Sequence, residues 1–165
     1  MLGETMTALE LMEKIDSSDA RYYVGELETG YVSLSSRRQY FRGYSFFTSK
    51  LAVSELHLMP IEFRQKHLIE MTIVAEAVQN AFRAKKMNVA YLGNSFPHVH
   101  WNIIPRYGTD PLPKDAIWSI DRELIESVAL PDDELMGVKR ALAAELARLA
   151  SSYGISAKLS ASSPI

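Results

Sequence analysis

The sequence contains no cysteine, and this excludes disulfide bonds and metal sites built from thiolates. It also lacks a long apolar run, since no stretch reaches the roughly 18 apolar residues that a membrane-spanning helix needs. The first residues, MLGETMTALELMEK, carry acidic side chains early and do not have the pattern of a signal peptide. Together these absences predict a soluble protein of a reducing, cytoplasmic compartment.

An excess of charge of one sign is also missing. The formal net charge is -2, which argues against broad electrostatic binding to nucleic acid or to an anionic membrane. A small polyanion needs no global positive charge, because a few well-placed donors can hold it. The composition therefore leaves a small anionic ligand open and disfavours nucleic acid and membrane as partners.

The length and the hydrophobic content suit one domain with one core. The chain has 165 residues, of which 47% are hydrophobic, and it shows no internal repeat. We expect a single domain over residues 1–165, with a core of about 20–118 and a helical C-terminal extension of about 119–155.

Hydrophobic periodicity separates the expected helices from the expected strands. Apolar residues at helical spacing predict helices over 5–15, 60–86 and 132–154. The expected buried stripes of the two long helices are Leu68, Met71, Val74, Val78 and Phe82 in the first and Leu135, Val138, Leu142, Leu146 and Leu149 in the second. Residues that favour strands predict β-structure over 21–34, with a turn near Thr29-Gly30, and over 43–48, 87–92 and 97–104. The small polar tail, 156–165, is expected to fray. This order predicts an α+β fold: a mainly antiparallel sheet of about five strands, one long helix after the third strand, and extra helices at both ends.

The segment that carries chemistry is PHVHWNIIPR, residues 97–106. Successive side chains of an extended chain face opposite sides, so His98, His100 and Asn102 share one face. Trp101 lies on the other face and is assigned to the core or to an interface. Two imidazoles and a carboxamide in a row are costly to bury unless they hydrogen-bond each other or a ligand.

Three interpretations of this row are open from the residues alone. The histidines can be structural groups on a wet sheet face, a pair of metal ligands, or part of an anion site. The loop Gly93-Asn94-Ser95, just upstream, can direct backbone N–H groups and a hydroxyl at an anion. A metal site lacks an obvious third ligand, because Asn102 is a poor ligand for zinc. The loop therefore favours the anion site.

At these residues the sequence resembles the histidine triad (HIT) family of nucleotide hydrolases and transferases. The family motif is His-x-His-x-His, followed by a short apolar run that often ends in Pro-Arg. The resemblance extends from about Tyr22 to Trp118 and is strongest over MNVAYLGNSFPHVHWNIIPR, residues 87–106. Two histidines alone would be a weak match. The match is specific because several features occur in the family's order: Gly43-Tyr44, a long helix, Asn88, Gly93-Asn94, Pro97 and the histidines. It implies a HIT-like form of the α+β fold.

The resemblance also implies roles for individual residues. His100 matches the middle histidine, which attacks the α-phosphorus of a nucleotide and forms a covalent nucleotidyl-imidazole. His98 matches the first histidine, which orients the nucleophile. Asn88, Asn94 and Ser95 match positions that contact the phosphate or lie close to it. Neutral donors of this kind can hold the charge that gathers on the non-bridging oxygens in the transition state.

The sequence departs from the family pattern at several positions. Asn102 stands where the motif has its third histidine, which faces the leaving group. An asparagine donates a hydrogen bond but is no general acid near neutral pH, although related transferases and phosphorylases carry glutamine there. Ala52 stands where relatives often have a histidine, and only Ser35 and Ser36 are near candidates for the ribose hydroxyls. Because of these departures, a second interpretation stays open, in which the protein binds nucleotides without turning them over.

What the resemblance implies for function is a nucleotide phosphohydrolase or nucleotidyl transferase that acts through catalytic residues His100, His98 and Asn102. Diadenosine tetraphosphate represents the first substrate class, and a homodimer is the expected assembly. No metal is required at the nucleophile, although Mg²⁺ is compatible with a polyphosphate substrate. The alternative is a non-catalytic nucleotide-binding or interaction protein on the same fold.

Four other residues lie outside the histidine row. Trp118 is balanced between packing and contact with the ligand. Arg106 is balanced between a phosphate contact and a surface ion pair. His57 and His67 lie away from the motif, and both are assigned as ordinary surface or helix residues.

Overall fold

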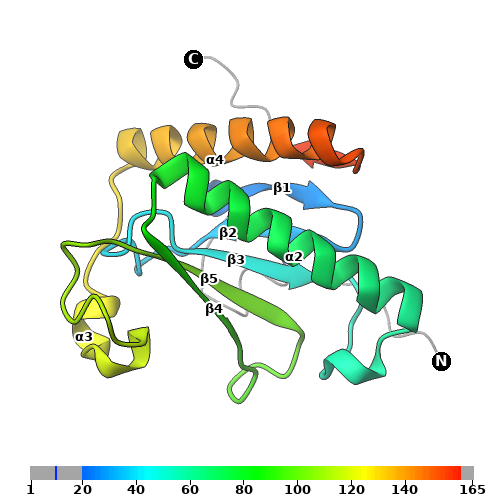
Figure 1. Cartoon of the computed structure of the whole chain (residues 1–165), viewed down its shortest axis with the longest axis horizontal. Coiled ribbons are helices and arrows are strands. Elements are labelled where there is room, and N and C mark those ends of the chain that lie inside the picture. The colour runs from blue at the N-terminus through cyan, green and yellow to red at the C-terminus, as the bar shows by residue number, and fades with distance from the viewer. Residues whose placement is uncertain (1–9, 11–19, 161–165) are drawn as a thin grey trace.

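A six-stranded sheet carries side by side the two long helices found within residues 20–160 (Figure 1). This computed structural model describes residue 10 and residues 20–160. The helix expected over 5–15 therefore lies almost entirely outside the described residues. All pairings between the six strands are antiparallel, and the expected α+β class is confirmed.

The strands occupy the sheet in the order β4-β5-β3-β2-β1-β6. Their bounds are Tyr23–Leu27 (β1), Gly30–Leu34 (β2), Ser45–Ser49 (β3), Lys86–Tyr91 (β4), His100–Arg106 (β5) and Ala157–Leu159 (β6). Within residues 20–160 the helices are Ile61–Phe82 (α2), Arg122–Ile125 (α3) and Asp132–Tyr153 (α4), with short 3-10 turns at Ala20–Tyr22, Leu56–Leu58 and Ile117–Ser119. As expected, the long helix α2 follows the third strand and a second long helix lies near the C-terminus.

The expectation of a fraying tail is wrong for residues 157–159, which form the sixth strand, whereas residues 161–165 lie outside the described residues. β6 pairs antiparallel with β1, with Gly25 opposite Leu159. Gly25 allows this close approach, because a Cβ there would lie 2.7 Å from the carbonyl oxygen of Lys158. The carboxylate of Glu26 also lies 3.3 Å from the ammonium of Lys158. A three-residue strand with so little periodicity gives no signal until its partner is known.

The helix α4 packs through the stripe that its sequence predicts. Three acidic residues occupy its first turn, where they complement the helix dipole, and Gly154 ends it in the left-handed conformation with φ 65°. The predicted buried residues are all buried: Leu135, Val138, Leu142, Leu146 and Leu149. These side chains join the core between the sheet and the two helices.

The buried face of α2 differs from the predicted one. The expected stripe included Leu68, Met71 and Phe82, which are only partly buried. The residues that α2 buries are His67, Glu70, Ile73, Val74, Ala77 and Val78. The helix contacts both the sheet and α4. Because two of the side chains that it buries are polar, the spacing of apolar residues alone does not identify its buried face.

His67 is therefore not an ordinary surface or helix residue, whereas His57 is exposed as expected. The Nε2 atom of His67 accepts a hydrogen bond of 3.2 Å from the indole N–H of Trp101, so the ring proton of the neutral imidazole resides on Nδ1. Nδ1 lies 3.0 Å from the hydroxyl of Thr29, which in turn donates to the carboxylate of Glu70. Burial, together with the nearby His98, lowers the pKa of His67 to about 4.

We expect this buried histidine to make the stability of the protein depend on pH. In the unfolded chain the imidazole titrates near its ordinary pKa of 6.5, so between pH 6.5 and about 4 only the unfolded state binds the proton. The free energy of unfolding then decreases as the pH falls through this window, by about 3 kcal/mol in total. Urea denaturation at pH 7, 6 and 5 measures the slope. The His67→Gln variant is expected to flatten it and the exposed His57→Gln variant to retain it; equal slopes in all three proteins would contradict the assignment.

The opposite face of the sheet carries a second, smaller apolar cluster. Phe46 and Ile104 contribute from β3 and β5, and Ile117, Ile120 and Ile125 contribute from the segment that follows β5. This segment thus folds against the face that α2 and α4 leave open.

Among residues 20–160, no helix is long and apolar enough to cross a membrane.

Candidate active site

A cavity of about 460 Å³ lies on the sheet face opposite the long helices. We call it the His100 cavity. Three separate parts of the chain line it: the region of β2 and β3, the loop that leads into β5 together with β5 itself, and the segment after β5. The lining residues include Arg38, Tyr44, Phe46, Asn94, Ser95, Phe96, His100, Asn102, Trp118, Ile120, Ile125 and Glu126.

The backbone around His98 fixes the imidazole of His100. β5 begins at His100, so His98 lies in the bend before the strand and not within it as the sequence predicted. The Nδ1 atom of His100 lies 2.7 Å from the main-chain carbonyl oxygen of His98. A carbonyl can only accept, so Nδ1 carries the proton and Nε2 carries the lone pair. His98 therefore orients His100 through its main chain and does not line the cavity itself.

The side chain of His98 has a separate anchoring contact. Its Nε2 atom donates to the carbonyl oxygen of Ser49 over 2.7 Å, and the residue is buried. This bond joins the bend before β5 to the end of β3. This contact helps to hold the main-chain carbonyl of His98 within hydrogen-bond distance of Nδ1 of His100.

The cavity keeps His100 neutral. Burial lowers the pKa of His100 below its ordinary value, and the charge of Arg38 lowers it further, against the opposing effect of the hydrogen bond to His98. At neutral pH the ring is therefore unprotonated at Nε2. A neutral imidazole with a free lone pair is the form that can attack an electrophile.

Asn102 is held in a single orientation by two neighbours. Its Oδ1 atom accepts a hydrogen bond of 2.8 Å from the hydroxyl of Tyr44. Its Nδ2 atom donates to the carbonyl oxygen of Ala90 over 3.3 Å. The carboxamide nitrogen has a second N–H, so Asn102 can offer a donor to the cavity but no acidic proton.

Two of the three expected substrate residues line the cavity. Asn94 and Ser95 lie on its rim with exposed side chains. Asn88 does not line it: its Oδ1 atom accepts from the guanidinium of Arg106 at 3.0 Å and from the backbone N–H of Ile117 at 3.1 Å. The structure thus places Asn88 in a support role beside the cavity.

The serines considered for ribose recognition do not line the cavity either. Ser35 is fully buried, and its hydroxyl accepts a hydrogen bond of 3.2 Å from the backbone N–H of Arg38. Ser35 therefore shapes the loop between β2 and β3, and Ser36 beside it also lies outside the cavity lining.

Arg38 is the functional candidate that the sequence did not single out. Its guanidinium lies over the rings of Tyr44 and Phe46, 5.7 and 5.8 Å from their centroids, and pairs with Glu126 at 3.1 Å. The only signal in the sequence is the Arg37-Arg38 pair in a polar loop. Its placement depends on a bridge between Arg38 and Val128, which are far apart in the chain.

Arg106 is neither a phosphate contact nor a surface ion pair. It is 2% exposed, and its Nε atom donates to Asp110 over 3.0 Å. The remaining N–H groups face Asn88 and the carbonyl oxygens of Pro111, Leu112 and Asp115. Arg106 is a buried structural residue that organises the loop after β5.

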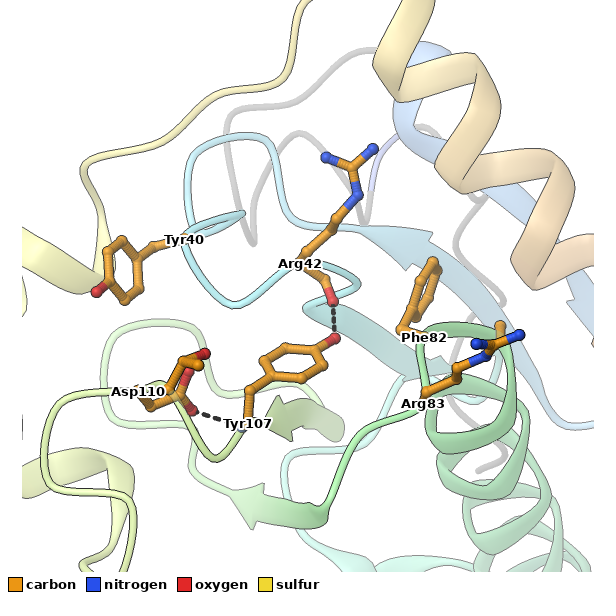
Figure 2. Close-up of a pocket in the computed structure, with 8 residues that line it drawn as sticks. Tyr40, Arg42, Phe82, Arg83, Tyr107 and Asp110 are labelled. Carbon is orange, nitrogen blue, oxygen red and sulfur yellow. Dashed lines mark hydrogen bonds between the residues drawn. The ribbon is translucent and has the colours of Figure 1, made fainter.

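A second hollow, of about 510 Å³, lies elsewhere on the surface and contains none of the histidine row. Figure 2 shows its walls, with the guanidinium of Arg42 turned away from Tyr107. That guanidinium pairs with Glu134 of α4 at 2.7 Å. This hollow contains no histidine, whereas the other cavity contains His100 and Asn102, so the His100 cavity is the better candidate. Within residues 20–160 no three His, Asp or Glu side chains are grouped to hold a metal ion.

Comparison with known proteins agrees with this geometry. Residues 46–109 match the HIT domain family model, whereas no curated protein matches the sequence. A histidine triad protein from Marinobacter aquaeolei has a TM-score of 0.67 at 23% identity, over 88% of this chain and 99% of its own. One from Bradyrhizobium japonicum has a TM-score of 0.67 at 20% identity, over 86% and 98%.

A more distant structure has a named activity. The diadenosine triphosphate hydrolase of Plasmodium falciparum has a TM-score of 0.55 at 14% identity, over 79% of this chain and 80% of its own. At these identities the likeness concerns the fold, and the family model covers the segment that contains the histidine row. This chain therefore has the fold of the histidine triad proteins, and its residues 46–109 match the HIT domain model.

Proposed function

We propose that this protein is a nucleotide phosphohydrolase or nucleotidyl transferase whose nucleophile is the Nε2 atom of His100. One observation carries the proposal. The hydrogen bond of 2.7 Å from Nδ1 of His100 to the carbonyl oxygen of His98 leaves Nε2 as the free nitrogen, and burial keeps the ring neutral. A neutral, oriented imidazole in a cavity is suited to covalent catalysis.

The proposed reaction has two steps. Nε2 attacks the α-phosphorus, an N–P bond forms, and the bond between phosphorus and the leaving oxygen breaks, with its electron pair leaving on that oxygen. Water or another acceptor then attacks phosphorus, loses its proton to the solvent, and returns the N–P electron pair to Nε2. The His98 carbonyl accepts from Nδ1 throughout, so it stabilises the positive charge that the ring carries in the intermediate.

The residues around His100 suit a nucleoside phosphate. Arg38, Asn94 and Ser95 offer a cation and neutral donors for phosphate oxygens. Phe46, Ile120 and Trp118 offer apolar and aromatic surface for a base. Dinucleoside polyphosphates, such as diadenosine tetraphosphate, are the proposed substrate class, and the fold shared with a diadenosine triphosphate hydrolase supports it. No metal is proposed at the nucleophile, and Mg²⁺ remains compatible with a polyphosphate.

The second candidate is a protein that binds nucleotides without turning them over. Asn102 favours it, because its carboxamide is held by Tyr44 and Ala90 and has no acidic proton for a departing group. Covalent labelling separates the two candidates. Mass spectrometry after mixing with the phosphorimidazolide of AMP is expected to show a nucleotidyl adduct on His100; AMP binding without an adduct would favour the binding protein.

A histidine at position 102 is expected to speed the reaction of substrates with poor leaving groups. An imidazole there supplies the general acid that the carboxamide lacks, an effect worth about a hundredfold or more in rate. The measurement is turnover of diadenosine tetraphosphate and of an adenosine phosphoramidate by the wild type and by Asn102→His. Asn102→Gln is the matched control that keeps an amide. An equal rate for Asn102→His and Asn102→Gln on both substrates would contradict a limit set by leaving-group protonation.

The assembly and location of the protein stay predictions. A homodimer is the expected state, and a single sedimenting species with the mass of one chain would overturn it. A cytoplasmic location and the absence of nucleic-acid and membrane partners are likewise proposals, based on the charge and on the nucleotide-sized cavity.

A further inference from the structure

Trp118 stands out among the residues of the His100 cavity because it is large, aromatic and 55% exposed. Its neighbours in the same segment, Ile117 and Ile120, are buried in the apolar cluster beneath the cavity. The other tryptophan, Trp101, is buried on the opposite face of β5 against His67. The chain thus exposes one indole at the cavity while it buries the nearby side chains of Ile117 and Ile120.

The loop that leads to Trp118, residues 107–117, is held firmly at its start. Figure 2 shows the hydroxyl of Tyr107 donating to the carbonyl oxygen of Arg42, over 2.5 Å, and the backbone N–H of Tyr107 donating to Asp110. Asp110 in turn accepts from the buried guanidinium of Arg106. The first residues of the loop are therefore tied both to the loop between β2 and β3 and to the end of β5.

The middle and the end of the same loop are held by Arg106 and Asn88. The guanidinium of Arg106 donates to the carbonyl oxygens of Leu112 and Asp115 over 3.2 and 2.9 Å. Oδ1 of Asn88 accepts from Arg106 and also from the backbone N–H of Ile117, the residue directly before Trp118. A single carboxamide oxygen on β4 thus connects the buried arginine to the backbone that positions the indole.

We propose that Trp118 determines specificity in the His100 cavity by stacking on the base of the bound nucleotide, and that Asn88 is a positioning residue for Trp118. The inference rests on the proposed function, since it assumes a nucleoside phosphate in that cavity. The apolar side chains of Phe46, Ile120 and Ile125 complete a wall that suits a planar ring, and every base offers a face for stacking. In this arrangement the donors Asn94 and Ser95 contact the phosphate and not the base.

The test compares the binding of AMP with the binding of ribose 5-phosphate, which has the phosphate and the sugar but no base. By calorimetry the wild type is expected to prefer AMP by about tenfold or more, the effect of stacking one base on an aromatic side chain. Trp118→Leu is expected to weaken AMP binding by about tenfold and to leave ribose 5-phosphate binding unchanged. Trp118→Phe, which keeps a ring, is expected to retain most of the preference.

Asn88 is tested with a matched pair of variants. Asn88→Asp keeps an acceptor for Arg106 and for the N–H of Ile117, so we expect it to preserve the preference for AMP. Asn88→Ala removes the acceptor and is expected to reduce the preference toward that of Trp118→Leu. A purely structural loss weakens both ligands alike and leaves their ratio unchanged, so an unchanged ratio in Asn88→Ala would overturn the positioning role.

The outcomes separate this inference from the function on which it rests. If wild type binds neither AMP nor ribose 5-phosphate, both the proposed function and the role of Trp118 are wrong. If it binds both ligands equally well, or if Trp118→Leu keeps the full preference for AMP, the nucleotide site stands and the stacking role of Trp118 is overturned. Loss of the preference in Trp118→Leu alone, with ribose 5-phosphate binding intact, supports the proposal.

Discussion

Replacing His100 by alanine is expected to reduce the turnover of diadenosine tetraphosphate by about a thousandfold or more. The substitution removes the only imidazole that lines the cavity, and with it the proposed N–P intermediate. A thousandfold change corresponds to about 4 kcal/mol of transition-state stabilisation. Initial rates of nucleotide release, measured for both proteins at saturating substrate, give the ratio directly.

The matched control for this prediction is His98→Ala. The contact that orients His100 comes from the main-chain carbonyl of residue 98, which every variant at this position retains. The substitution does remove the donor to the buried carbonyl of Ser49, at a cost to stability of about 1–3 kcal/mol. We expect a smaller loss of rate than in His100→Ala, on the order of tenfold. Full activity in His100→Ala would show that His100 is not the nucleophile.

Arg106→Met is expected to destabilise the protein more than any surface substitution. It leaves Asp110 without its cation in a site where both side chains are almost fully buried, at 2% and 5% side-chain exposure. It also removes the donors to three carbonyl oxygens of the 107–117 loop. Breaking a buried ion pair from one side costs about 3–5 kcal/mol, which lowers the midpoint of thermal unfolding by about 10 °C in a domain of this size.

Two variants sharpen the test of Arg106. Arg148→Met breaks an ion pair with Glu145 on the surface of α4, and exposed pairs contribute little, so we expect the midpoint to stay nearly unchanged. The double variant Arg106→Met with Asp110→Asn removes the unpaired charge and is expected to regain part of the loss. If Arg106→Met unfolds at the same temperature as Arg148→Met, the arginine does not organise the loop.

Much of the fold could be predicted because its signals are local. Helix α4 is predicted by acidic residues at its start, leucines at helical spacing and a glycine at its end. The hairpin of β1 and β2 follows from strand-favouring residues on both sides of Thr29-Gly30. β6 escaped detection because its three residues gain stability only from pairing with Gly25 and its neighbours in β1.

The buried polar residues were harder to predict than the apolar ones. His67, Glu70 and Arg106 look like surface residues by type, and burial of such groups is uncommon unless they are paired. In each case the partners come from distant segments: Thr29 and Trp101 for His67, and Asn88 and Asp110 for Arg106. A pattern of apolar spacing carries no information about those pairings.

Some features of the candidate site could likewise be predicted from the sequence, and others could not. The placement of His100 and Asn102 on one face of β5 and of Trp101 on the other follows from the alternation of an extended chain, which is a property of the backbone alone, whereas His98 lies before the strand. Only the tertiary structure decided that His98 acts through its carbonyl, that Arg38 joins the cavity, and that Trp118 remains exposed beside it. Those placements depend on contacts between the loop after β2, the strand β5 and the segment that follows it. Such contacts exist only once the sheet has assembled and the 107–117 loop has folded around Arg106.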